Sequence, residues 1–157
     1  MTKDIVITII GRQTIEQETN QTEVVTEAVY YYKNGHHYVM YDELPDSGPH
    51  IVHNRLKFDD HTLEMSKKGG LTARLFFVPG ARYKSEYGTP VGPMQMETVT
   101  NQYTLAETED LIEVYLQYRI FINEYTMSEH ELKIRIVPNA ELHPRRTENP
   151  DTDTELL

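Results

Sequence analysis

Histidine is the residue in this chain best suited to metal binding or acid–base chemistry, and the chain has seven. His50 and His53 are three residues apart, so on a strand they would lie on opposite faces. The adjacent pair His36 and His37 falls beside a predicted turn. Because the chain has no cysteine that could supply thiolate ligands, we expect no metal site. Instead, we expect exposed histidines at turns and strand edges.

The other groups that could carry a reaction lack the sequence context that activates them. None of the serines lies in a nucleophile-elbow pattern. These serines are Ser47, Ser66, Ser85 and Ser128. Gly69-Gly70 and the stretch 88–92 precede strand-like segments and lack the Lys-Ser/Thr ending of a phosphate-binding loop. The sequence therefore favours a protein that is not an enzyme, and it indicates neither a catalytic residue nor a cofactor.

Charge and length limit the partners and the number of domains. The 157 residues are enough for one domain with one core. The formal net charge is -10, whereas nucleic-acid and anionic-membrane surfaces usually present clustered Lys and Arg. We therefore expect no nucleic-acid partner and no membrane partner. The N-terminal apolar run Ile5 to Ile10 is too short for a signal peptide or a membrane span, and we expect a cytoplasmic protein.

The chain divides into a folded part and a polar tail. From Asn139 onward the apolar content falls, and Pro144, Pro150 and alternating Asp and Thr residues take over. We predict a single domain over residues 1–138 and a disordered acidic tail over residues 139–157.

The stretch from Asp110 to Pro138 has the clearest secondary-structure pattern. Apolar or aromatic residues alternate with polar ones over residues 112–122, which predicts a strand with one buried face. After a polar break at Ser128 to Glu131, the alternation resumes at Leu132. The two segments predict a long β-hairpin.

The rest of the chain consists of similar short segments separated by turns. Asn34-Gly35 is a strong hairpin signal, because both central residues of such a turn need positive φ. A polar stretch at Glu18 to Thr22 separates the first two predicted strands. The predicted strands cover 4–17, 23–32, 37–41, 50–58, 62–66, 71–77, 82–87 and 94–105. Consecutive hairpins predict an all-β fold, an antiparallel up-and-down β-barrel of about 8 to 10 strands, although a two-sheet sandwich has the same local pattern.

A family resemblance supports the barrel. Phe77, Gly80, the element Tyr87-Gly88-Thr89-Pro90 and Gly92 are followed by alternating Met94, Met96 and Thr98. With Asn34-Gly35, the strand around Leu56 and the final hairpin, they resemble the YwiB-like family, a domain of unknown function, over about Ile5 to Val137. The resemblance implies a calycin-like, lipocalin-type β-barrel and no established activity. The family often has Arg-x-Gly where this chain has Ser66 to Gly69.

Alternation also predicts which side chains face the barrel interior. The charged residues opposite the apolar positions should point outward. They are Arg55, Lys57, Glu64, Arg74, Glu97, Glu113, Arg119, Lys133 and Arg135. An interior without charge lacks the usual acid and base pair. The inward polar candidates are Asn54, Thr26, Thr98, Thr100 and Tyr118.

The inward residues allow two interpretations. They could orient one small apolar or aromatic ligand, or they could simply fill the barrel. The candidate ligand-binding residues are Asn54, Met65, Phe77, Met94, Met96, Tyr118 and Tyr30.

Three functions remain open from the sequence. The first is a small-molecule binding protein. The second is a structural or interaction protein with a packed barrel and no ligand. The third is a cofactor-free enzyme, which requires a buried charge such as Arg74 or Glu64 beside Tyr118. We expect a monomer or a homodimer, the latter through pairing of an edge strand such as Asp4 to Gln17.

Overall fold

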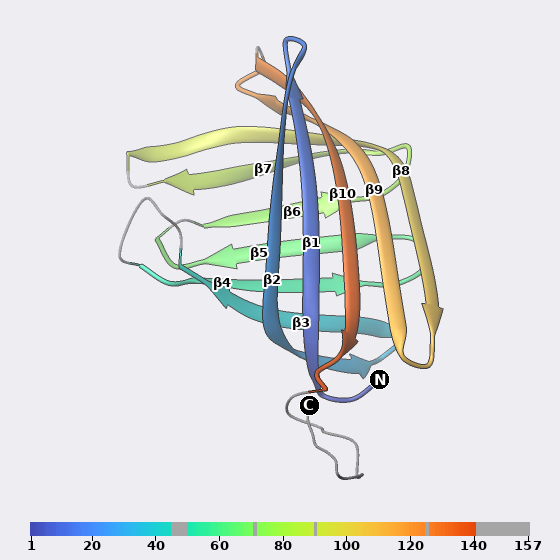
Figure 1. Ribbon diagram of the computed structural model, residues 1–157. Coiled ribbons are helices and arrows are strands. Elements are labelled where there is room, and N and C mark those ends of the chain that lie inside the picture. The colour runs from blue at the N-terminus through green and yellow to red at the C-terminus, as the bar shows by residue number, and fades with distance from the viewer. Residues whose placement is uncertain (45–49, 71, 90, 125, 141–157) are drawn as a thin grey trace, which may run out of the picture.

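The protein is a single sheet of ten antiparallel strands (Figure 1). The computed structural model describes residues 1–44, 50–70, 72–89, 91–124 and 126–140. The strands are β1 (Asp4–Ile15), β2 (Glu18–Lys33), β3 (His36–Glu43), β4 (Val52–Phe58), β5 (Leu63–Lys68), β6 (Ala73–Phe77), β7 (Arg82–Thr89), β8 (Gly92–Thr108), β9 (Leu111–Ile122) and β10 (Thr126–Pro138). This confirms the predicted all-β class and strand number.

Strand order decides between barrel and sandwich. Neighbours follow the order β6-β5-β4-β3-β2-β1-β10-β9-β8-β7, so each strand pairs with the next in sequence except β6 with β7, and β1 also pairs with β10. The first and last strands pair along ten residues, from Ile5 opposite Pro138 to Thr14 opposite Glu129. Strand β2 pairs with β1 along most of its length and with β3 at its end, and β8 pairs with β7 at its start and with β9 farther along. In Figure 1, β1, β9 and β10 run upright and β3 to β7 lie across them. The sheet is therefore continuous and nearly closed, as the barrel prediction requires.

The seam of the barrel lies between β6 and β7, in the middle of the chain. Here one antiparallel bridge joins Thr72 to Gly88, through backbone hydrogen bonds of 3.0 and 2.7 Å. Farther along β6, the side-chain hydroxyl of Thr98 on β8 donates to the carbonyl oxygen of Phe76 at 2.9 Å. A buried side chain thus satisfies an edge carbonyl that would otherwise need a strand partner.

Register separates an inner and an outer face on every strand. Tyr30, Val39, Leu56, Met65 and Leu75 lie opposite one another across β2 to β6, and all five are buried. The next outer row consists of Tyr31, Tyr38, Lys57, Glu64 and Phe76. Charged residues opposite the apolar positions are at least partly exposed, as predicted from period two.

Tight turns are where sequence and structure differ. Glu16 and Gln17 connect β1 to β2 with φ of 48° and 74°, and Asn123 and Glu124 connect β9 to β10 with φ of 51° and 67°. Both pairs have the positive φ at two central residues that type I′ hairpins require, as does the predicted Asn34-Gly35. Glu and Gln rarely adopt this conformation, so composition did not reveal the turns.

Two predicted polar breaks are therefore wrong. The stretch Glu18 to Thr22 belongs to β2, and Ser128 to Glu131 belongs to β10. Both stretches are polar, but they are held by complete pairing with neighbouring strands. Pairing to a partner outweighs low local strand preference.

The end of the barrel extends slightly past the predicted domain boundary. Asn139 is buried, and its backbone N–H donates to the carbonyl of Asp4 at 3.0 Å. The predicted disordered tail from residue 141 lies outside the described residues. No helix long and apolar enough to cross a membrane occurs in the part of the chain that the structure describes.

Candidate functional site

The predicted ligand-binding residues all lie on the inner side of the barrel wall or in its core. Their exposed fractions are Phe77 0%, Asn54 3%, Met96 7%, Tyr30 8% and Met65 9%, while Met94 and Tyr118 are half-buried. Phe77 and Tyr118 are in contact, with ring centroids 4.5 Å apart. The other predicted residues lie on β2, β4, β5 and β8, and Tyr30, Met65 and Met96 belong to the same buried core as Phe77.

Much of the barrel interior is filled by side chains. Val39, Leu56, Phe58, Phe77 and Leu116 have no exposed surface. A void large enough for a water molecule beside any of them would leave some of its surface accessible. A ligand within this part of the barrel would have to displace packed side chains, and whether the predicted interior residues bind one stays a prediction.

Charge does enter the barrel at one end, contrary to the prediction of an uncharged interior. Asn54 faces inward, and its amide oxygen accepts a hydrogen bond of 2.6 Å from the Lys67 ammonium. Its amide nitrogen donates to Glu43 at 3.0 Å, and Lys67 pairs with the same carboxylate at 3.2 Å. Lys67 lies directly opposite Asn54 in the register. The three groups satisfy one another, as a buried amide requires.

The charges that would have supported an enzyme lie elsewhere. Arg74 and Glu64 form an ion pair of 2.7 Å on the outer face, and the Arg74 side chain is 64% exposed. Tyr118 points into the barrel, where, among the residues that the structure describes, His130 is its one titratable ring neighbour. The buried charge beside Tyr118 that the enzyme interpretation needs is therefore not supplied by Arg74 or Glu64.

A second polar group lies in the interior near the start of β10. Ser128 is buried, and its hydroxyl shares a hydrogen bond of 2.7 Å with Nε2 of His130. The His130 ring stacks on Tyr118 at 4.9 Å with an interplanar angle of 2°. Burial lowers the pKa of His130 and raises the pKa of Tyr118 to about 12, so both are neutral at pH 7. Among the described residues, no third group orients Nδ1 of His130, and the pair is therefore not a catalytic triad.

One of the histidines expected at exposed turns is a core residue. The His37 side chain is 5% exposed, stacks on Phe58 at 4.9 Å and shares a 2.8 Å hydrogen bond with the hydroxyl of Tyr30. Burial lowers the pKa of His37, partly opposed by the carboxylate of Glu107 at 3.7 Å. Because side chains alternate between the two faces of β3, residue 37 faces the interior. The hydroxyl of Tyr30 gives its ring nitrogen the hydrogen-bond partner that burial requires.

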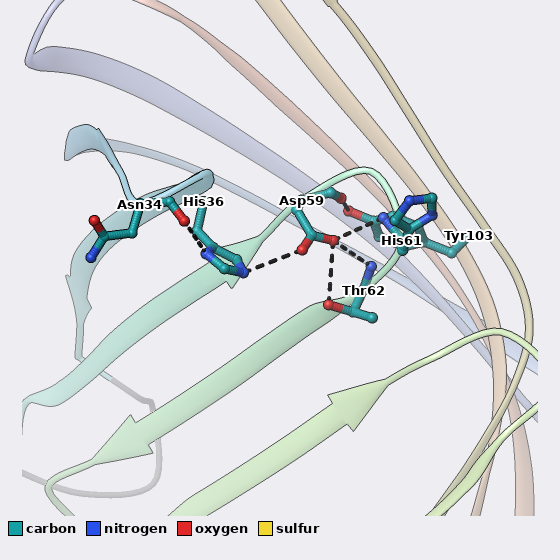
Figure 2. A network of polar contacts seen from close by, with 6 residues as sticks. All are labelled: Asn34, His36, Asp59, His61, Thr62 and Tyr103. Carbon is teal, nitrogen blue, oxygen red and sulfur yellow. Dashed lines mark hydrogen bonds and ion pairs between the residues drawn. The ribbon is translucent and has the colours of Figure 1, made fainter.

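The neighbouring residue His36 belongs to a network of hydrogen bonds and an ion pair that stabilises the β4–β5 turn (Figure 2). One carboxylate oxygen of Asp59 accepts hydrogen bonds from the backbone N–H groups of His61 and Thr62 at 2.8 and 2.9 Å. The other oxygen pairs with Nε2 of His36 at 3.2 Å. The hydroxyl of Tyr103 on β8 donates to the Asp59 carbonyl at 2.6 Å. Three separate parts of the chain meet at Asp59, and the contacts are structural.

No metal site emerges from these clusters. Within the described residues, no group of three or more His, Asp or Glu side chains could hold an ion.

A concave site lies on the outer face of β7, β8 and β9, a hollow of about 650 Å³. Lys84, Glu97 and Phe121 lie opposite one another in one row across these three strands. The hollow is lined by Arg82, Lys84, Ser85, Gln95, Met96, Glu97, Phe121, Asn123 and Glu124. Its volume falls in the range of small-molecule sites, about 300 to 1,000 Å³.

One aromatic ring in this region lies close to two guanidinium groups. The central guanidinium carbons of Arg82 and Arg119 are 5.5 and 5.8 Å from the ring centroid of Phe121. Both arginines are in the neighbouring register row, on either side of Val99. Glu97 binds Arg82 at 2.5 Å and fixes its position. The arrangement combines apolar surface, positive charge and amide groups.

Two other hollows lie on the surface. One of about 280 Å³ lies over β1, β8, β9 and β10, and several of its polar groups are engaged within the protein, because Arg12 pairs with Glu131 at 3.4 Å and Gln117 donates to Tyr115. Another, of about 630 Å³, includes Tyr115, whose hydroxyl donates to Glu131 at 2.5 Å.

Sequence reasoning named two residues that line the main hollow, Met96 and Glu97. It assigned Met96 to the barrel interior and placed Glu97 correctly on the outer face, but it assigned neither to an outer site. The register that joins Lys84, Glu97 and Phe121 depends on three strands. Phe121 itself offered a signal, because it is an aromatic residue at an outward position of a strand.

Comparisons with known proteins agree with this fold. A family model described as Domain of unknown function (DUF1934) matches residues 7–134. The crystal structure of the ywiB protein from Bacillus subtilis is similar, with a TM-score of 0.79 and 19% sequence identity over 87% of this chain and 92% of that chain. No curated protein matches the sequence. At this identity the structural likeness concerns the fold, and the nearly closed antiparallel barrel fits the calycin-like architecture. Because the family model spans most of the ten strands, the chain belongs to the DUF1934 family of unknown function.

Proposed function

We propose that this protein binds a small aromatic ligand carrying an anionic group, in the hollow on the outer face of β7 to β9. The observation that carries the proposal is the ring of Phe121 within 6 Å of two guanidinium groups in a hollow of about 650 Å³. A flat ligand ring can stack on an aromatic side chain or on a guanidinium plane, which stabilises binding by about 0.5 to 1.5 kcal/mol for an aromatic pair.

Polar groups around the hollow support an anionic substituent. The Lys84 ammonium is exposed and, within the described residues, forms no ion pair. Arg82 shares its charge with Glu97 but retains further N–H donors. The amides of Gln95 and Asn123 provide both donors and acceptors at the rim. A few polar groups around an apolar base are typical of ligand sites.

A dye that is both aromatic and anionic tests this proposal. We expect 8-anilinonaphthalene-1-sulfonate to give a saturable fluorescence increase with one site per chain. The variant Phe121→Leu should weaken its binding about fivefold, the equivalent of about 1 kcal/mol. The variant Arg82→Gln should weaken the dye but not an uncharged naphthalene analogue.

Tyr115→Leu is the matched control, because Tyr115 is also an outward aromatic residue of β9 but lies outside this hollow. Absence of saturable binding, or an equal loss in Tyr115→Leu and Phe121→Leu, would refute the proposal. Circular dichroism of each variant establishes that the dye reports a folded site. Native mass spectrometry of gently purified protein would identify a natural ligand directly.

A protein that binds only other proteins is the second candidate, and the filled barrel favours it. Leu56, Phe58 and Phe77 border no space for a ligand. Exposed apolar side chains such as Val25, at 60% exposure, and Leu44, at 67%, are available to a partner. Dye binding that is insensitive to Phe121→Leu would favour this candidate.

A further inference from the structure

The outer face of β2 to β6 has a pattern that the whole-chain charge conceals. Tyr31, Tyr38, Lys57, Glu64 and Phe76 lie opposite one another in a single row across five strands. At about 4.8 Å between neighbouring strands the row is about 19 Å long. Aromatic side chains therefore stand at both ends of the row.

The ring contacts along the row are well defined. The rings of Tyr31 and Tyr38 stack at 4.7 Å with an interplanar angle of 9°. At the other end, Phe76 contacts Tyr83 at 5.5 Å. Tyr31 and Tyr83 are 39% and 40% exposed, which is high for such large side chains. Exposed rings on a sheet are the platforms on which bases of single-stranded nucleic acids stack.

Cations lie between the aromatic ends. The Arg55 guanidinium and the Lys57 ammonium are 6.0 and 5.9 Å from the ring of Tyr38. In the next register row, Arg55 and Arg74 lie on either side of Ser66. The arginine side chains are 41% and 64% exposed, so both reach solvent.

The single acid within the two rows, Glu64, leaves them with an excess of positive charge. Glu64 is only 12% exposed and pairs with Arg55 at 3.3 Å and Arg74 at 2.7 Å. The two rows hold three bases and one acid, in a chain with 15 bases and 25 acids. Our expectation of no nucleic-acid partner used the net charge of -10, an argument that holds only where charge is evenly distributed.

We propose that the outer face of β2 to β6 binds single-stranded nucleic acid. Bases stack on Tyr31 at one end of the row and on Phe76 at the other. Phosphates bind Arg55, Lys57 and Arg74. This inference does not depend on the hollow around Phe121. An acidic peptide or an anionic membrane is the competing occupant, and neither uses the exposed rings at both ends of the row.

Fluorescence anisotropy with labelled oligo(U) of about twelve nucleotides tests the proposal. We expect binding at about 50 mM salt that weakens roughly 20-fold at about 200 mM, the slope for three phosphate contacts on a single strand. The double variant Lys57→Gln/Arg74→Gln should lower that slope by about 1.4. Tyr31→Ser should weaken binding at least about fivefold without changing the slope, because it removes stacking and no charge.

The matched control is Lys133→Gln/Arg135→Gln, which removes the same charge from exposed positions of β10. An equal loss in the control would overturn the proposal, as would the absence of binding at about 100 µM protein. Retained affinity in Tyr31→Ser would also overturn it. If a hexaglutamate peptide or anionic phosphatidylserine vesicles displace the oligonucleotide but oligo(U) does not displace them, the face belongs to an acidic partner and the proposal is wrong.

Discussion

The substitution Asp59→Ala tests directly how much the polar contacts of Asp59 contribute to the stability of the barrel. The change removes the acceptor of two backbone N–H groups, those of His61 and Thr62, at 2.8 and 2.9 Å. It also removes the ion pair with His36 at 3.2 Å. Hydrogen bonds to a charged group contribute about 1.5 to 3 kcal/mol each when fully buried. The Asp59 side chain is 28% exposed, so we discount these values and expect a total loss of about 2 kcal/mol.

Chemical denaturation with urea measures this loss as a change in the free energy of unfolding. For a protein of this size, about 2 kcal/mol corresponds to a decrease in melting temperature of about 4 to 8 °C. Asp60→Ala is the matched control, because the adjacent carboxylate is exposed and forms no hydrogen bond among the described residues. We expect the control to change stability by less than about 0.5 kcal/mol. The Tyr103 hydrogen bond goes to a backbone carbonyl and persists in both variants.

The pH dependence gives an independent check. Burial alone would raise the pKa of Asp59, but the N–H groups of His61 and Thr62, together with His36, outweigh burial and lower it. A carboxylate with a lowered pKa stabilises the fold above its unfolded pKa, and this contribution is lost as the pH falls through the folded pKa. The difference between wild type and Asp59→Ala should therefore shrink below about pH 4. A difference that is equally large at low pH, or an equal loss in Asp60→Ala, would refute the reasoning.

Two further predictions concern the packing of the wall. Gly69→Ala should destabilise the protein severely, because the new Cβ would lie 2.0 Å from the carbonyl oxygen of Ile51. The control Gly35→Ala meets no atom within 4 Å and should cost only about 1 kcal/mol at its positive φ. Equal melting temperatures for the two variants would contradict this prediction. The buried His37 has a lowered pKa, so its stabilisation is complete above about pH 6.5 and decreases as the pH falls. Urea unfolding gives the free energy of unfolding at about pH 7 and at about pH 5. The decrease between the two pH values should be smaller for His37→Gln than for wild type, and an equal decrease in both proteins would show that His37 does not titrate in this range.

The fold was predictable because period-two alternation is a local property. Ile112, Val114 and Leu116 point inward wherever the strand pairs, so the core face and the outward charges follow from residues two apart. Position 37 shows the limit of this reasoning. Residue type suggested an exposed histidine, although alternation placed it inside, and the Tyr30 hydroxyl supplies the hydrogen bond that makes its burial tolerable.

The sequence by itself determined the all-β class, the family and the facing of most side chains. Only the tertiary structure decided which outward residues share a site, because register and sheet closure join strands distant in sequence. The irregularity between Thr100 and Gln102 shifts the pairing of β8 with β9, and the register beyond it puts Phe121 opposite Glu97 with Arg82 and Arg119 alongside. A bulge bends its strand and increases the local twist. Neither the shift nor the hollow beside it is encoded in the local spacing of residues.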